Sequence, residues 1–303
     1  MNEPMRKYMR VGIVNFMAFP ATLKGEGPII EATRAICQDD YFDVIEVTWI
    51  KDAETRKKVR KMVETAGLTL AYGSQPRMLT TGSNINDLDE AKRKTALASL
   101  KEGIDEAYEL GAKGYAFLSG KYQEETKKQS FEALLDSAGQ LCEYAASKGD
   151  MPVLLEVFDY DFDKKSLIGP APLARKFADK MKIKYHNFGL MVDLSHIVQI
   201  HETLRENLLP IAPYIRHAHI ANAVMKAGAD AVGDMHPRFG FPNSEIGVEQ
   251  VMDFLRLLME IGYLNTKCPP IVSFEVKPWG EGEEPEFVIA NAKRVLNEAW
   301  ARL

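Results

Sequence analysis

Residues 189–196 read Gly-Leu-Met-Val-Asp-Leu-Ser-His, a short apolar run that ends in a carboxylate. Residues 153–158, Val-Leu-Leu-Glu-Val-Phe, have the same form. Apolar runs without polar alternation are typical of strands in a parallel sheet that is covered on both faces. A carboxylate inside such a strand is costly to bury unless it is paired or bound to a metal ion. These two runs therefore predict a parallel sheet and a polar site at its edge.

The rest of the chain repeats this unit, because short apolar runs alternate with longer segments of helical periodicity. In residues 89–110, Leu97, Leu100 and Ile104 share one helical face, and Gly111 stands where the helix should end. The predicted strands are residues 11–16, 44–48, 68–72, 115–118, 152–157, 188–192, 215–220 and 271–276. The predicted helices are residues 29–37, 53–66, 89–110, 130–147, 172–181, 201–208, 247–261 and 285–303.

Eight strand and helix pairs in a chain of 303 residues predict an α/β protein with the architecture of a (β/α)8 barrel. A doubly wound open sheet is the alternative, but no Gly-x-Gly-x-x-Gly motif follows the first strand. No stretch has the composition of a linker, so we expect residues 1–303 to form one domain.

Composition narrows the class of protein. The 38 basic and 43 acidic residues give a net charge of −5, which disfavours a nucleic-acid binder. Cys37, Cys142 and Cys268 are scattered and contain no Cys-x-x-Cys pair, as in a reduced cytosolic protein. The N-terminal segment lacks the features of a signal peptide, and no apolar stretch approaches the roughly 20 residues of a membrane span. We expect a cytoplasmic protein without nucleic-acid or membrane partners.

Polar residues mark the ends of the last four predicted strands. Active sites of barrels lie at the carboxyl ends of the strands, where this chain places Glu156, Asp193 and Glu275. His217 and His219 lie two residues apart, and so on one face of the seventh strand. One such group alone would more often be a salt-bridge partner or a core histidine. Four in succession predict a metal site, and carboxylate and imidazole ligands without thiolate suit Mn²⁺, Co²⁺, Mg²⁺ or Zn²⁺.

Between Glu156 and Glu275 the sequence resembles the xylose isomerase-like TIM barrels, the sugar isomerase and epimerase superfamily that includes the ketose 3-epimerases. The Asp-x-x-His motif of those enzymes is matched by residues 193–196, which implies that His196 contacts a substrate hydroxyl. Glu46 also resembles a residue on the second strand of the family. The resemblance implies one divalent ion, Mn²⁺ in the first place, and four ligands: Glu156, Asp193, His219 and Glu275.

The resemblance also implies a reaction. The ion would hold a sugar carbonyl with its neighbouring hydroxyl and stabilise the enediolate that forms when the adjacent C–H proton leaves. Glu156 and Glu275 would then be the catalytic base and acid. Tyr72, Gln75 and Arg77, around the end of the third strand, are further candidates for substrate contact.

One departure from the epimerases lies after the seventh strand. Those enzymes carry a substrate-binding Arg six residues beyond the metal-binding His, where this chain has Met225. A longer loop follows, with Gly-Asp-Met-His-Pro-Arg-Phe-Gly at residues 233–240. We expect His236 or Arg238 to replace the missing contact, and we count His217 among the substrate-binding candidates. A purely structural lid is the alternative interpretation of this loop.

The chain is also similar to the α subunits of bacterial C-glycoside deglycosidases. Those barrels cleave the C–C bond between a 3-oxo-sugar and an aromatic aglycone, in complex with a small β subunit. The missing Arg and the long loop favour this lyase reaction on a glycoside, and a small β subunit or a homo-oligomer is the partner it implies. A ketose 3-epimerase or sugar isomerase is the alternative.

Two other classes remain as weaker alternatives. An endonuclease for abasic DNA would need a histidine-rich cluster of three metal ions and a basic surface, but the chain has six histidines and a negative net charge. A non-catalytic sugar-binding barrel would keep the same ligands for stability alone.

Overall fold

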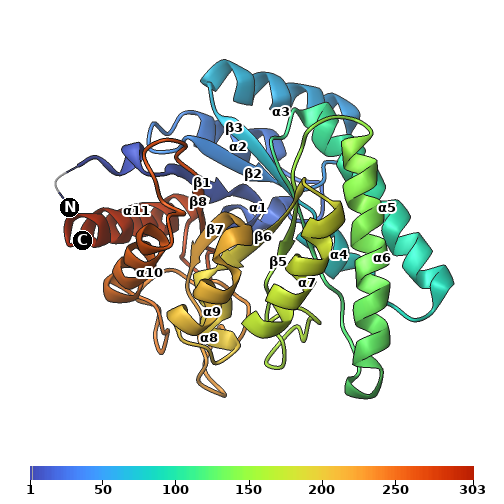
Figure 1. Cartoon of the computed structure of the whole chain (residues 1–303). Coiled ribbons are helices and arrows are strands. Elements are labelled where there is room, and N and C mark those ends of the chain that lie inside the picture. The colour runs from blue at the N-terminus through green and yellow to red at the C-terminus, as the bar shows by residue number, and fades with distance from the viewer. Residues whose placement is uncertain (2) are drawn as a thin grey trace.

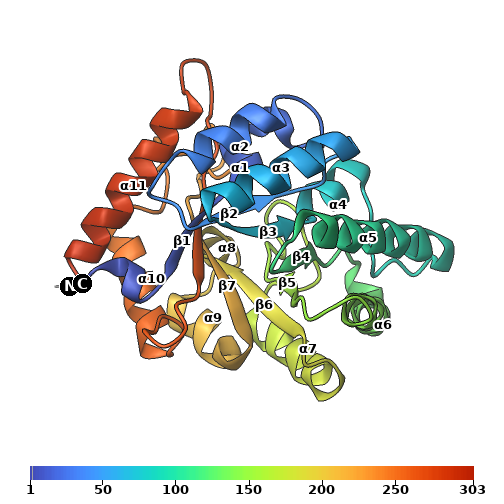
Figure 2. The same cartoon turned by 90° about the horizontal axis from the view of Figure 1, so that it is seen from above.

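A computed structural model describes Met1 and residues 3–303, and it closes eight parallel strands into a barrel in the order β1 to β8. The last strand returns to the first, where Ser273 of β8 lies in register with Gly12 of β1. Figure 2 shows the strands at the centre and the helices in a ring around them, and Figure 1 gives the side view. The predicted (β/α)8 barrel is confirmed.

The strands are β1 (Arg10–Val14), β2 (Val44–Val47), β3 (Thr69–Gly73), β4 (Tyr115–Leu118), β5 (Val153–Glu156), β6 (Phe188–Asp193), β7 (Ile215–Ala221) and β8 (Ile271–Glu275). The α-helices are α1 (Asn15–Ala18), α2 (Ile29–Cys37), α3 (Ala53–Ala66), α4 (Gln75–Thr81), α5 (Glu90–Leu110), α6 (Lys127–Ala146), α7 (Ala171–Lys184), α8 (Leu194–Gln199), α9 (Leu204–Ile211), α10 (Val248–Glu260) and α11 (Pro285–Ala301). The 3₁₀ helices are η1 (Met5–Lys7), η2 (Pro20–Thr22), η3 (Glu124–Thr126) and η4 (Ala212–Tyr214).

Local capping sets the ends of the long helices. Asp89 accepts hydrogen bonds from two backbone N–H groups in the first turn of α5, and Gly111 ends that helix with a φ of 77°. Thr203 and Glu206 form a capping box before α9. The predicted helix at 201–208 therefore begins three residues later than expected, because the cap lies inside the apolar pattern.

Three short helices were not predicted from periodicity. They are α1, α4 and α8, which follow β1, β3 and β6 at or directly after the strand end. With four, seven and six residues they span at most two turns, which is too short for an amphipathic stripe to be recognised. They lie at the carboxyl ends of their strands and so shape the mouth of the barrel.

An apolar layer joins the barrel to the surrounding helices. Phe177 of α7 packs edge-on against Phe131 of α6, at a ring distance of 5.6 Å, and lies 5.8 Å from Phe188 of β6. All three side chains are buried. This layer fixes the strands in place, so that the polar residues at their ends are held on rigid elements.

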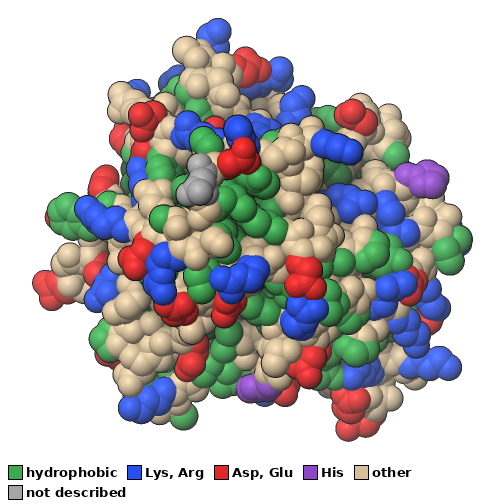
Figure 3. All heavy atoms as spheres, turned by 60° about the vertical axis from the view of Figure 1, so that its left-hand side comes forward, with side chains coloured by type: hydrophobic (Ala, Val, Ile, Leu, Met, Phe, Trp, Pro, Cys, Tyr) green, Lys and Arg blue, Asp and Glu red, His purple; other side chains and the backbone are tan. Residues whose placement is uncertain are grey.

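The surface carries both signs of charge. On the face around the two termini, drawn in Figure 3, Lys and Arg side chains are interspersed with Asp and Glu. Among the helices of the described residues, none combines the length and the apolar character needed to cross a membrane.

Candidate metal centre and active site

Strands β5 to β8 bring the four predicted ligands together. Nδ1 of His219 lies 3.8 Å from Oε1 of Glu156, 3.8 Å from Oδ2 of Asp193 and 2.8 Å from Oε2 of Glu275. Glu156, Asp193 and Glu275 are each the last residue of their strand, and His219 lies within β7. Only the Glu275 side chain has appreciable exposure, at 12%. Three carboxylates and one imidazole therefore share a buried space at the mouth.

The donor atoms in this space fit a divalent cation. Oε1 of Glu156, Oδ2 of Asp193 and Nδ1 of His219 are buried without a hydrogen-bond partner among the described residues. Buried polar atoms are rarely left unpaired in folded proteins, and Nδ1 of His219 lies 3.8 Å from each of the other two atoms. Metal bonds of about 2.1 Å place neighbouring ligand atoms roughly 3 Å apart, close to the observed spacing. Ligand atoms of Glu156, His219 and Glu275 lie within 4.8 Å of one another, which is consistent with a divalent metal site, and Asp193 lies beside this group.

The other polar atoms of the ligands are held by neighbouring groups. Gln75, at the start of α4, donates from Nε2 to Oε2 of Glu156 at 2.9 Å. Ser195 donates its backbone N–H and its hydroxyl to Oδ1 of Asp193, both at 2.5 Å. Glu156 and Asp193 thus each turn one oxygen toward the common space while the protein fixes the other, as expected for oriented metal ligands. Gln75 was predicted as a substrate contact, and the structure places it against Glu156.

Glu46 of β2 contacts the ring nitrogen of His219 that is not directed at the three carboxylates, and so orients this imidazole. Its two carboxylate oxygens each lie 3.3 Å from Nε2 of His219, and Oε1 also accepts from Nε2 of His217 at 2.7 Å. Burial alone would raise the pKa of Glu46, but the two imidazoles hold it well below its usual range. A proton on Nε2 of His219 leaves the Nδ1 lone pair for the cluster. His217 therefore contacts Glu46, although the sequence suggested a substrate contact.

The pKa values in the cluster reflect crowded carboxylates. Burial raises the pKa of Glu156 to about 7, and the charge of Glu275 adds to the effect. Burial would lower the pKa of His219, but Glu46 and Glu275 raise it well above the usual range. The carboxylates around His219 favour its protonated form. A bound divalent cation would balance their negative charge in place of that proton.

The loop between β7 and α10, residues 222–247, closes over the cluster. Its Asp234 accepts from Nε2 of His196 at 3.0 Å and lies 2.8 Å from Nε2 of His236. His236 reaches further, to 3.6 Å from Oε1 of Glu275 and 3.3 Å from the hydroxyl of Ser195. Its backbone has a φ of 46°, and its carbonyl accepts from the N–H of Lys277. The loop thus joins both histidines to the rim of the ligand cluster.

The contacts of this loop form a second group of side chains that could bind a metal ion. His196, Asp234 and His236 each offer an atom within 4.8 Å of the others. Burial would lower the pKa of both histidines, but the nearby carboxylates raise the pKa of His196 to about 10 and that of His236 to about 9. Burial would raise the pKa of Asp234, but the two histidines hold it well below its usual range.

Of the predicted substrate contacts, His196 and His236 are brought to the cluster. Nδ1 of His196 lies 3.5 Å from Oε1 of Glu156, and its ring packs 4.2 Å from that of Phe158. Arg238 is placed differently, because its Nε donates to Glu283 at 2.7 Å. The guanidinium is thus paired with the loop after β8.

Two functional candidates were missed or left without a role. Asp234 lies in a long irregular loop, where no periodic pattern distinguishes a buried carboxylate from a solvated one. Glu46 was noted for its likeness to the family, but only the barrel closure brings β2 across from β7. A charged residue within the apolar run at 44–48 was the available signal.

Three solved structures illustrate the similarity of the fold. D-psicose 3-epimerase from Clostridium cellulolyticum H10, solved with D-tagatose, is 17% identical, with 97% of this chain and 96% of that chain covered and a TM-score of 0.66. The 3-keto-D-glucoside 4-epimerase YcjR from E. coli is 16% identical, with coverage of 95% and 99% and a TM-score of 0.69. The IOLI protein with a bound zinc atom is 15% identical, with coverage of 97% and 99% and a TM-score of 0.73.

Comparison with curated proteins gave no match. A family model described as the xylose isomerase-like TIM barrel matches residues 36–296, which include Glu46 and all four predicted ligands. The match covers most of the chain and agrees with the closed barrel and the ligand cluster at its mouth. The chain belongs to the family of xylose isomerase-like TIM barrels.

Proposed function

We propose that the protein is a metal-dependent sugar isomerase or epimerase that moves a proton at a carbon next to a carbonyl group. The observation that carries the proposal is the convergence of unpartnered buried atoms from Glu156, Asp193 and His219 with the carboxylate of Glu275. Such a set holds a divalent ion through ligands that are fixed from behind. We take Mn²⁺ as the first candidate, with Co²⁺, Mg²⁺ and Zn²⁺ as alternatives.

A divalent ion bound there would polarise the sugar carbonyl and stabilise negative charge on the adjacent oxygens. The protein's own residues move the proton. Glu156 and Glu275 stand on β5 and β8, which are separated by two strands, so they approach the common space from different directions. In this proposal one carboxylate removes the C–H proton and the other returns one, which inverts or relocates the stereocentre.

His196 and His236 are proposed to hold the substrate hydroxyl groups. Both imidazoles now contact the carboxylate of Asp234. A sugar hydroxyl has the same capacity to accept a hydrogen bond and would take the place of one of these contacts. Closure of the loop over the sugar would then keep water from the reacting carbon.

The names of the similar structures support this reaction class. Two of them are epimerases for a ketose and for a keto-glucoside, and a third structure holds zinc. These names favour an isomerase or epimerase over the lyase that the loop after the seventh strand suggested. An abasic-site endonuclease gains no support from the mixed surface charge or the net charge of −5.

The lyase reaction is the second candidate. Met225 stands in place of the epimerases' Arg, and the extended loop places Asp234 over His196 instead. The same proton abstraction next to a carbonyl would expel an aglycone from a 3-oxo-C-glycoside if a leaving group stood on the next carbon. A small β subunit or a second copy of the chain is the partner that we propose for this case.

Solvent deuterium incorporation tests the two reactions side by side. The protein, loaded with Mn²⁺, is incubated in D₂O with a panel of free ketoses, a 3-oxo-glucoside and a 3-oxo-C-glucoside. We expect exchange at one carbon together with formation of its epimer or isomer. Aglycone release from the C-glucoside alone would establish the lyase, and the absence of both exchange and aglycone release with every sugar would contradict both reactions. The Glu275→Gln variant is the control for exchange by free metal.

A further inference from the structure

Two lysines from different loops lie beside the ligand cluster and have no role in the proposed reaction. Lys164 belongs to the loop between β5 and α7, and Lys277 to the loop between β8 and α11. Neither lysine is fully exposed, because the Lys164 side chain is 27% exposed and Lys277 is partly buried. Removing an ammonium group from water is costly unless an anion is paired with it. The partners of the two ammonium groups therefore show whether an anion is missing here.

Lys277 follows the proposed ligand Glu275 by two residues. Successive side chains of an extended chain point to opposite sides, and Val276 between the two belongs to the apolar core. Pro278 restricts Lys277 to extended backbone, so Lys277 lies on the same side of the chain as Glu275. The backbone N–H of Lys277 donates to the carbonyl of His236 at 2.8 Å. Lys277 is thus held between the end of β8 and the loop over the cluster.

The ammonium group of Lys277 has no carboxylate partner. No carboxylate oxygen of the described residues lies within 4.0 Å of its Nζ. Its contact is the ring of Trp279, whose centroid lies 5.9 Å from Nζ, near the outer limit of roughly 6 Å for a cation–π contact. Burial and the charge of Lys164 lower the pKa of Lys277, although the charge of Asp234 opposes them. The two ammonium groups therefore lie near enough to repel each other.

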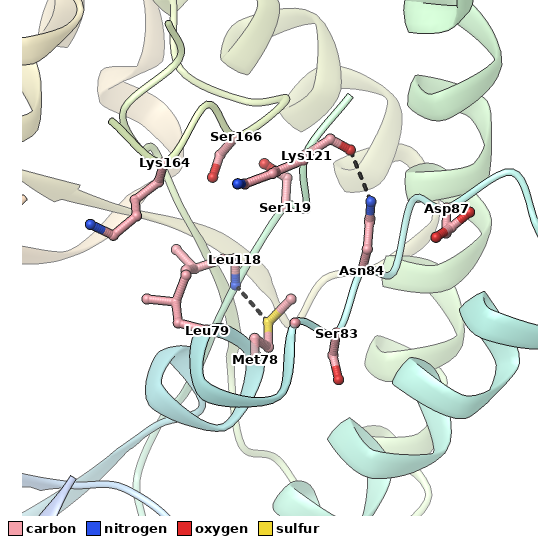
Figure 4. A pocket seen from close by; sticks show the side chains of 12 residues that line it. Met78, Leu79, Ser83, Asn84, Asp87, Leu118, Ser119, Lys121, Lys164 and Ser166 are labelled. Carbon is pink, nitrogen blue, oxygen red and sulfur yellow. Dashed lines mark hydrogen bonds between the residues drawn. The ribbon is translucent and has the colours of Figure 1, made fainter. Parts of the chain in front are cut away.

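Lys164 approaches the same place from another loop. Figure 4 shows it at the edge of a pocket of about 480 Å³ between α4, the end of β4 and the loop after β5, with its side chain directed away from Lys121 and Ser166. Its Nζ lies 3.7 Å from Oδ2 of Asp234 and also pairs with Asp163. The ammonium group thus turns away from the pocket and faces the loop over the cluster.

Basic groups crowd around the carboxylate of Asp234. Its Oδ1 lies 3.0 Å from Nε2 of His196 and 2.8 Å from Nε2 of His236, and its Oδ2 faces Lys164. Lys277 is a fourth basic group whose charge interacts with Asp234. One carboxylate shared among four basic groups leaves a place for a further negative charge beside Lys277.

We propose that Lys277 and Lys164 bind an anionic group of the substrate, so that the reacting sugar carries a carboxylate or a phosphate at the end remote from its carbonyl. Both groups present oxygens that accept charge-assisted hydrogen bonds from ammonium donors. Two residues of extended chain span about 7 Å, which separates an acid held by Lys277 from a carbonyl held beside Glu275. The position of the carbonyl rests on the proposed function, whereas the anion site rests on the two lysines.

Binding is measured first, because it requires no turnover. Titration calorimetry of the Mn²⁺-loaded protein compares three ketoses that differ only at carbon 6: D-fructose, D-fructose 6-phosphate and D-fructuronate, in which carbon 6 is a carboxylate. We expect at least one acid to bind about tenfold more tightly than D-fructose, with a preference that falls as salt is added. The acid that binds more tightly identifies the anionic group. Equal affinity for the three ketoses, or binding of none, would overturn the inference.

Removal of single charges locates the bound group. Lys277→Met and Lys164→Met keep a long side chain without the ammonium group, so each should reduce the preference for the acid to less than about threefold. Lys226→Met is the matched control, because Lys226 is an exposed lysine in the loop over the cluster and its Nζ donates to Asn243. This variant should keep the full preference, and thermal unfolding checks that all three variants fold. A preference that survives in both Lys277→Met and Lys164→Met would place the acid on the metal ion or elsewhere and overturn the inference.

Turnover separates this inference from the proposed function. Deuterium exchange from D₂O is followed in D-fructose and in the acid that binds more tightly. A lower KM for the acid in the unmodified protein, lost in Lys277→Met, supports both. A preference for the acid in binding with no exchange in either sugar contradicts the proposed function while it supports the anion site. Exchange in both sugars with equal KM supports the proposed function and overturns the anion site.

Discussion

Strands β5–β8 and β1–β4 end at one mouth of the barrel but present different side chains there. Strands β5–β8 supply Glu156, Asp193, His219 and Glu275. Each of the strands β1–β4 is followed directly by a buried neutral residue. These residues are Asn15, Thr48, Ser74 and Ser119. Burying four ionisable groups is costly unless a cation or protons compensate them, so they gather on one side. We expect substrate to lie on the neutral side, where Ser119 helps to line a pocket of about 480 Å³.

The largest expected effect separates the two halves by activity. Glu275→Gln keeps the size of the side chain and removes the carboxylate, so the rate of sugar deuterium exchange should fall about 10³-fold. Thr48→Val is the matched change in the neutral half, of equal size and without the hydroxyl, and should change the rate less than about threefold. Thermal unfolding checks that both variants fold. Similar losses in the two variants would erase the distinction between the halves.

Metal affinity should also depend on residues of β5–β8 and not on the neutral residues that follow β1–β4. His219→Ala removes the one imidazole among the proposed ligands, and we expect metal affinity to fall by roughly 100-fold or more. Asn15→Ala, at the end of β1, should retain the metal. Elemental analysis after dialysis against a buffered metal concentration measures both. Unchanged stoichiometry in His219→Ala would remove His219 from the ligand set.

Glu46 links the two groups of strands, because it lies on β2 and contacts His219 on β7. Glu46→Gln should lower metal affinity about 10- to 100-fold, since an amide holds the imidazole tautomer less firmly than a carboxylate. Glu106→Gln is the control, another mostly buried carboxyl that accepts from the backbone of Ile50. The ¹⁵N shifts of the His219 ring should report a changed tautomer. Full affinity in Glu46→Gln would confine the metal centre to β5–β8.

The sequence allowed the barrel and the four proposed ligands to be predicted because each strand carried few charges in an apolar run. The period of the strand alone did not distinguish His217 from His219, which share a face, and only the resemblance to the family singled out His219 as the ligand. Both contact Glu46, but it is Nδ1 of His219 that lies within 3.8 Å of all three carboxylates. That distinction needs the closed barrel, which sets β2 opposite β7.

Loop residues were harder to predict for a physical reason. Asp234 is buried by contacts with His196 and Lys164, which come from two other connections of the barrel. Contacts between loops leave no periodic trace in the sequence. The polar character of residues 233–240 suggested function there, but it did not show which side chains turn inward.

The smallest expected effect concerns Arg238, the second residue proposed to replace the epimerases' Arg. Its guanidinium pairs with Glu283 and is 35% exposed, so Arg238→Ala should change KM less than about twofold, and a pair with this exposure contributes about 0–1 kcal/mol to stability. His236→Ala should raise KM more, because His236 lies at the rim of the cluster beside Glu275. Steady-state kinetics of the two variants on one sugar decides between them. A tenfold rise in KM for Arg238→Ala alone would mean that Arg238 leaves Glu283 to contact the substrate. The loop would then bind the substrate in a closed form in which Arg238 faces the mouth of the barrel.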